Sequence, residues 1–65
     1  MNQLIGTAGT IEGAQHILST YLCGSITTLN KIDKNTWSVI NSKGHAIGLQ
    51  IVCKRNRYRI EEVIQ

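Results

Sequence analysis

The sequence predicts an α+β fold in which one α-helix packs on a curled antiparallel β-sheet of four to five strands. One segment near the N-terminus has the apolar spacing of an amphipathic helix, and the rest of the chain consists of strand-like segments separated by short turns. Strands joined by tight turns pair as antiparallel neighbours, and one face of the resulting sheet needs an apolar cover. The helix supplies that cover, so the expected element order is β-α-β-β-β-β.

Length and composition favour a single small domain spanning residues 1–65. The hydrophobic fraction is 42%, and the chain has no Phe, so its core must be built mainly from Ile, Leu and Val. A chain of this size buries only about 60% of the surface that its unfolded form exposes, which leaves few apolar residues for a deep pocket. We therefore expect a binding protein and not an enzyme.

The N-terminal part is predicted to contain a brief edge strand and the helix. Leu4 and Ile5 are the apolar pair of the strand. Thr10 is a suitable N-cap for the helix, and Gly24 is placed to end it in the left-handed conformation. The helix is expected to bury one apolar face, made by Ala14, Ile17, Leu18, Tyr21 and Leu22.

Four strands are predicted after the helix, at residues 25–32, 36–41, 45–54 and 57–64. Short turns at 33–35, 42–44 and 55–56 separate them, and each turn contains Asn or Gly. Side chains alternate between the faces of a strand. In the last strand this alternation points Tyr58 and Ile60 toward the helix and leaves Arg57 and Arg59 in solvent.

The hairpin that closes the chain is strongly basic. Four of the seven basic residues of the chain lie in six positions, and they are Lys54, Arg55, Arg57 and Arg59. Cationic donors on an uncovered sheet face suit the phosphates of a nucleic acid or another acidic partner. Lys43 and Lys31 are candidates to assist them. The alternative is that charges on an exposed hairpin only prevent strand-to-strand aggregation.

Trp37 has two interpretations, which depend on the direction of its strand. If Val39 points inward, so does Trp37, and the indole belongs to the core. If Ile40 points inward, Trp37 faces solvent and becomes a contact aromatic for a partner. Alternation favours the first interpretation.

The residue types that carry metal or catalytic chemistry are present without a suitable spacing. His16 and Cys23 stand seven residues apart on the helix, about 10.5 Å along its axis, too far to share one zinc ion easily. His45 and Cys53 complete the set, and no CxxC or HxxxH pair occurs. Neither a nucleophile elbow nor a phosphate-binding loop is found. We expect no metal, no cofactor and no small-molecule substrate.

The two cysteines and the hydropathy of the chain bear on its compartment. No secretory leader is visible at the N-terminus, and no apolar run approaches the ~20 residues that span a bilayer. The expectation is a cytoplasmic protein with reduced thiols at Cys23 and Cys53 and no membrane partner. One structural disulfide between them is the alternative.

The layout resembles small phage-encoded inhibitors of bacterial defence, the anti-CRISPR proteins among them. The resemblance rests on the helix ending at Leu22-Cys23-Gly24, the Ile/Thr-rich strand with Lys31-Ile32, the loop before Trp37 and the basic last hairpin. It is one of architecture, so no functional residue is transferred. The resemblance implies surface occlusion without chemistry, inside a bacterial host cell.

The expected function is therefore that of a non-enzymatic binder whose basic hairpin engages nucleic acid or a nucleoprotein complex. The alternative is a protein-interaction or homo-oligomerisation module that uses the sheet edges and outer face, because a chain this small gains stability by forming a dimer.

Overall fold

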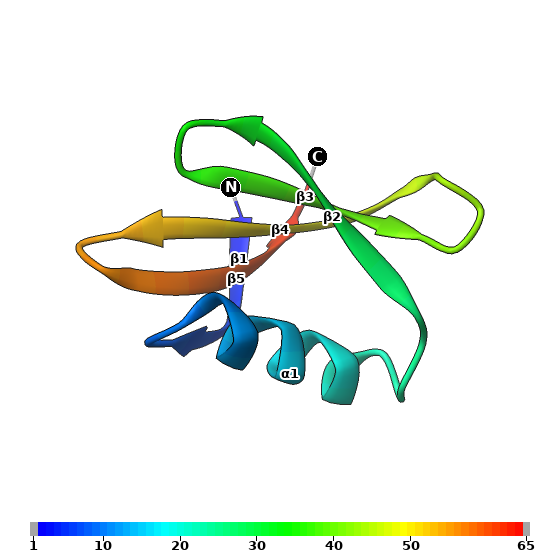
Figure 1. Cartoon of the computed structure of the whole chain (residues 1–65), viewed down its shortest axis with the longest axis horizontal. Coiled ribbons are helices and arrows are strands. Elements are labelled where there is room, and N and C mark those ends of the chain that lie inside the picture. The colour runs from blue at the N-terminus through cyan, green and yellow to red at the C-terminus, as the bar shows by residue number, and fades with distance from the viewer. Residues whose placement is uncertain (1, 65) are drawn as a thin grey trace.

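The computed structural model describes residues 2–64 and contains one helix and five strands in these residues (Figure 1). The element order is the predicted β-α-β-β-β-β. The elements are β1 (Asn2–Ala8), α1 (Ile11–Tyr21), β2 (Thr27–Asp33), β3 (Thr36–Asn41), β4 (Ala46–Lys54) and β5 (Arg57–Val63).

The five strands form one antiparallel sheet in the order β1-β5-β4-β3-β2. The last four strands are a meander, as their short turns predict. The N-terminal strand pairs with the C-terminal one, which makes β1 and β2 the edge strands. The sheet is not strongly curled, so the curl expected from the sequence is wrong. A single short helix does not require the sheet to wrap around it.

Helix α1 begins and ends with local hydrogen bonds. The Thr10 hydroxyl accepts from the backbone N–H of Gly13 at 3.0 Å, as expected of the N-cap. At the other end, Gly24 N–H donates to the Ser19 carbonyl and Cys23 N–H donates to the Thr20 carbonyl. This pattern is a Schellman motif, and its first left-handed residue is Cys23 (φ 56°), followed by Gly24 (φ 82°). From the sequence, only Gly24 was predicted to adopt the left-handed conformation.

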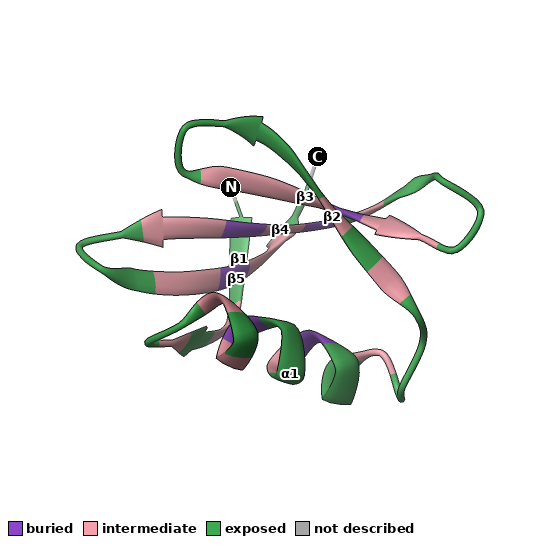
Figure 2. Ribbon diagram, viewed as in Figure 1, coloured by how far each residue is buried: buried purple, intermediate pink, exposed green. Residues whose placement is uncertain are grey.

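The core lies between α1 and the sheet. Its buried residues come from α1 and the three central strands, and they are Ala14, Leu18, Val39, Leu49, Ile51 and Ile60 (Figure 2). Gly6 faces Ile60 across the β1–β5 ladder, and a Cβ on Gly6 would come within 3.3 Å of the Ile17 side chain. The absence of a side chain there lets the helix approach β1 closely.

The helix covers only part of the sheet, because its main contacts are with β1 and β5. On the same face, β2, β3 and β4 carry the half-buried apolar side chains Leu29, Trp37 and Ile47. Tyr21 was expected in the buried helix face but is 49% exposed. It is the last residue of the helix, where the chain turns away toward β2 (Figure 1).

Three irregularities interrupt the strand ladders. The pairing register shifts between Leu4 and Gly6 in β1, between Lys31 and Asp33 in β2, and between Ser38 and Ile40 in β3. Each is a β-bulge or similar irregularity, and two of them lie in the edge strands. No helix within residues 2–64 is long and apolar enough to cross a membrane.

Candidate polyanion-binding site

The β4–β5 hairpin places its basic side chains in register. Lys54 lies directly opposite Arg57, and Val52 lies opposite Arg59, while Arg59 also faces Thr7 of β1 on its other side. Tyr58 and Ile60, which alternate with the arginines, pack toward the core. The strand phase predicted from the sequence is therefore confirmed, and the cationic side chains lie on the face that no helix covers.

The turn of this hairpin is two residues long. Arg55 and Asn56 both have positive φ, at 54° and 64°. Positive φ at both central residues is the geometry of a type I′ turn, whose twist matches that of the flanking strands. Asn tolerates this conformation well, but Arg is an unusual residue for it. The turn places a fourth cation at the tip.

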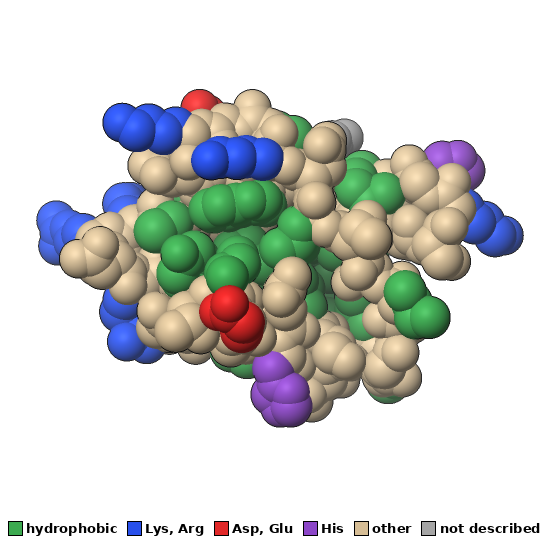
Figure 3. All heavy atoms as spheres, viewed as in Figure 1, with side chains coloured by type: hydrophobic (Ala, Val, Ile, Leu, Met, Phe, Trp, Pro, Cys, Tyr) green, Lys and Arg blue, Asp and Glu red, His purple; other side chains and the backbone are tan. Residues whose placement is uncertain are grey.

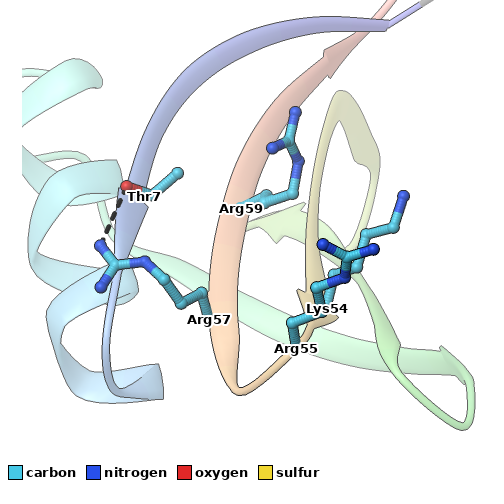
Figure 4. A pocket seen from close by; sticks show the side chains of 5 residues that line it. All are labelled: Thr7, Lys54, Arg55, Arg57 and Arg59. Atoms are coloured by element: carbon cyan, nitrogen blue, oxygen red, sulfur yellow. Dashed lines mark hydrogen bonds between the residues drawn. The ribbon is translucent and has the colours of Figure 1, made fainter.

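These side chains line one open concavity of about 420 Å³, formed by Thr7, Lys54, Arg55, Arg57 and Arg59 (Figure 4). In this view Arg57 reaches toward β1, whereas Lys54 and Arg55 project on the other side of β5. The cations thus come from the end of β4, the turn and the first part of β5, and β1 contributes the Thr7 hydroxyl.

Two of the four cations are held by neighbours within the protein. Arg57 donates from Nη2 to the Thr7 hydroxyl at 3.2 Å, and Arg59 donates from Nε to a Glu61 carboxylate oxygen at 3.2 Å. Within residues 2–64, Lys54 and Arg55 make no hydrogen bond or ion pair through their side chains. An arginine has five N–H donors, so Arg57 and Arg59 each keep several for a ligand.

Glu61 is the centre of a polar network on the same outer face. Its carboxylate accepts from Gln50 at 3.0 Å and from Asn2 at 3.2 Å, in addition to Arg59. Burial of the carboxylate opposes its ionisation. The hydrogen bonds from Gln50, Asn2 and Arg59, with the charge of Arg59, outweigh this effect and hold the pKa of Glu61 below its usual value. Glu61 is therefore a carboxylate at neutral pH and offsets part of the local positive charge.

The surface remains strongly cationic in spite of Glu61. Like charges directly opposite each other, such as Lys54 and Arg57, destabilise a strand pair by a fraction of about 1 kcal/mol. The two side chains relieve part of this repulsion by projecting to opposite sides of β5, and an anionic ligand in the concavity would offset more of it. The arrangement can bind several phosphates or carboxylates.

The other residues predicted for the site lie elsewhere. Lys31 is on the helix side of the sheet, with its Nζ 5.6 Å from the centre of the Trp37 ring, and Lys43 lies in the β3–β4 turn. Neither lines the concavity. Trp37 points inward with Val39 and packs on the core, 6.0 Å from the ring of Tyr58. Of the two interpretations of Trp37, the one that places the indole in the core is therefore correct.

The cysteines and histidines considered as metal ligands do not form a cluster within the described residues. Cys23 and Cys53 are both free thiols, and the two histidines, His16 and His45, are exposed. No group of three or more His, Cys, Asp or Glu side chains within the described residues could hold a metal ion.

Sequence reasoning did not find the network around Glu61. Strand alternation placed Glu61 on the outer face with Arg57 and Arg59. Its contacts with Asn2 and Gln50 depend on the registers of β1 with β5 and of β4 with β5. The β1–β5 pairing joins the two ends of the chain, and no local pattern specifies it.

Comparison with known proteins finds no matching family model, no matching curated protein and no matching solved structure. The resemblance to phage inhibitors therefore stays an expectation that rests on architecture.

Proposed function

We propose that this protein is a non-enzymatic binder that uses the β4–β5 hairpin to hold a polyanion, either a nucleic acid or the acidic surface of a nucleoprotein complex. The observation that carries the proposal is that Lys54, Arg55, Arg57 and Arg59 all line one open concavity. Only one of the four acidic residues of the chain, Glu61, is paired with this group.

The contacts of the two arginines support recognition of phosphate. Thr7 and Glu61 restrict the rotamers of Arg57 and Arg59 before any ligand arrives. Less side-chain entropy is then lost on binding than with unrestrained cations. Lys54 and Arg55 have no acidic partner within residues 2–64, so their charges can attract an anion at long range and steer it toward the concavity.

The wider role that we propose is inhibition of host defence by a phage-encoded protein, of the anti-CRISPR kind. Such a protein works by occluding a surface, and a nucleoprotein complex offers an acidic one. The size of the chain, its single domain and its cationic face are compatible with this mode.

The test is the salt dependence of binding to labelled DNA and RNA, measured by fluorescence anisotropy. If all four cations contact phosphates of a duplex, the logarithm of the association constant should fall linearly with the logarithm of the salt concentration. Each contact contributes ~0.9 to the slope, so the expected slope is about −3.6. In the double variant Lys54→Gln/Arg57→Gln the slope should become about two units shallower, because two of those contacts are removed.

The matched control is the double variant Lys34→Gln/Lys43→Gln, which has the same net charge but leaves the hairpin intact. It should bind with nearly the wild-type slope. Equal losses in the two double variants would mean that net charge alone drives binding, and the hairpin would lose its role. A pull-down from bacterial lysate with and without nuclease then separates nucleic acid from nucleoprotein as the natural ligand.

A second proposal is a protein-interaction module that uses the outer face. Leu4 and Val63 lie on the outer face of β1 and β5 and are 46% and 37% exposed. The bulges in β1 and β2 count against association through the sheet edges, because a bulge interrupts the hydrogen-bonding groups that another strand would pair with. If the double variant Lys54→Gln/Arg57→Gln still captures a protein from nuclease-treated lysate, that result would favour this second proposal.

A further inference from the structure

An apolar area remains open on the helix side of the sheet. Figure 3 shows hydrophobic side chains gathered in the hollow between α1 and strands β2 and β3. We call this area the helix-side patch and define it by Leu29, Trp37 and Tyr58. All three pack on the core but are only half-buried.

The patch exists because the helix is too short and too far to one side to cover the sheet. Eleven residues of α1 pack mainly on β1 and β5. Leu29 in β2 pairs with Val39, and Trp37 in β3 pairs with Ile51, so both are directed toward the same side as the core. A sheet face of this kind normally has a second layer over its whole width.

The exposed area of the chain agrees with a missing layer. Its accessible surface is 4566 Å², whereas a monomeric protein of its mass is expected to expose about 4,100 Å². The radius of gyration is 10.7 Å, which matches the value of about 10.7 Å expected for 65 residues. The longest axis is 31 Å against 23 Å and 20 Å for the other two, so shape contributes to this area, and the uncovered part of the sheet adds to it.

The two borders of the patch carry opposite charges. On the β2 side, Lys31 lies over the Trp37 ring. On the helix side, Figure 3 shows an acidic side chain beside the hollow, over α1, whose acidic residue is Glu12 in the first turn. A two-fold axis that runs along the hollow would place the lysine border of one copy against the glutamate border of the other.

We infer that the helix-side patch is the interface of a symmetric homodimer. Trp37 and Tyr58 form its centre, and Lys31 of each copy pairs with Glu12 of the other. The second copy supplies the missing apolar layer, and the opposite borders fix its orientation. The cationic concavity lies on the other face of the sheet, so this inference is independent of the proposed function.

The test is the mass of the purified full chain by sedimentation, from micromolar to submillimolar concentration. The mass should rise from 7.2 kDa toward twice that value. Trp37 is the single tryptophan, so its fluorescence should shift to the blue over the same concentration range as the indole leaves water.

Charge exchange tests the orientation of the two copies. Lys31→Glu and Glu12→Lys should each weaken the dimer about tenfold, because each creates two repulsive pairs in a symmetric interface. The double variant Lys31→Glu/Glu12→Lys should recover most of the affinity. Lys43→Glu makes the same charge change in the distant β3–β4 turn and should leave the mass unchanged.

Two results would overturn the inference. If the chain stays monomeric at submillimolar concentration, the helix-side patch is not a homodimer interface and would bind a different protein. A dimer that tolerates both single reversals would use another surface.

Discussion

Gly48 is the third residue of β4 and has a φ of 79°, whereas most strand residues have negative φ. At this point the β3–β4 register advances by two residues in β3, from Ser38 to Ile40, and by four in β4, from Gln50 to Ala46. Residues 47–49 thus lie opposite Val39 alone. Gly48 adopts the left-handed conformation that the extra residues require, which a residue with a Cβ adopts only with strain.

We expect Gly48→Ala to lower the free energy of unfolding by about 1–2 kcal/mol. A Cβ at this position meets no atom within 4 Å, so the loss would come from backbone strain and not from a clash. Urea denaturation measures it. Gly9→Ala is the control, because Gly9 also has open space around it but does not have positive φ. Equal effects in the two variants would contradict this explanation.

Glu61 makes the protein sensitive to acid. The lowered pKa of its carboxyl means that the folded state favours the ionised form. The stability from this group is present above its unfolded pKa of about 4.5 and is lost as the pH falls through the lower folded value. Acid destabilises the folded state because protonation of Glu61 removes its ion pair with Arg59. Protonation also removes acceptor sites that the Asn2 and Gln50 side chains use.

Glu61→Gln should destabilise the protein by about 1–2 kcal/mol at neutral pH, since an amide offers fewer acceptor sites to the three donors. The difference from the wild type should shrink as the pH falls through the folded pKa. Denaturant titrations at several pH values measure it. Glu62→Gln is the control for the change in net charge, because Glu62 does not accept from Asn2, Gln50 or Arg59. A constant difference for Glu61→Gln over this range would show that its ionisation does not contribute.

At the scale of elements, the β4–β5 hairpin combines a strained turn with a cationic surface. Arg55 occupies a position with φ of 54°, where Asn or Gly is preferred. The neighbouring pair Lys54 and Arg57 is repulsive. Both features lower stability, and both place positive charge beside the same concavity. Residues kept at a cost to stability are often functional ones.

Arg55→Asn should therefore change stability and binding in opposite directions. The unfolding free energy should rise by about 0.5–1 kcal/mol, because Asn adopts the left-handed conformation more readily. Affinity for nucleic acid should fall, with a salt slope about one unit shallower. Thermal denaturation and anisotropy titrations measure the two effects.

Arg55→Gln separates charge from conformation, because it removes the charge but keeps a side chain that is unsuited to the turn. It should weaken binding to the same extent without the gain in stability. A gain in both variants would mean that charge repulsion, and not backbone strain, limits this turn.

At the scale of the whole molecule, local patterns predicted most of the fold. The apolar spacing of the helix and the Thr10 cap located α1, and the turn residues located the strands of the meander. Alternation around Tyr58 and Ile60 correctly left Arg57 and Arg59 on the outer face. The cationic group of the candidate site was therefore predictable, since it lies within one hairpin.

Features that depend on distant contacts were not predictable. The pairing of β1 with β5 brings Thr7 to Arg57 and Asn2 to Glu61 across almost the full length of the chain. The footprint of α1 on the sheet, which leaves Trp37 half-open, depends on how closely Gly6 lets the helix approach β1. Periodicity identifies which face of the helix is apolar but not which strands that face covers.

The cationic concavity and the helix-side patch occupy opposite faces of one sheet, so a ligand on one does not obstruct the other. In a dimer joined through the patches, the two concavities would point away from each other. If each concavity binds nucleic acid as proposed, such a dimer would act as a cross-linker that tethers two nucleic-acid strands or two distant segments of one strand. Once the first segment is held, the second arrives at high effective concentration, so modest individual contacts would give a long-lived bridge.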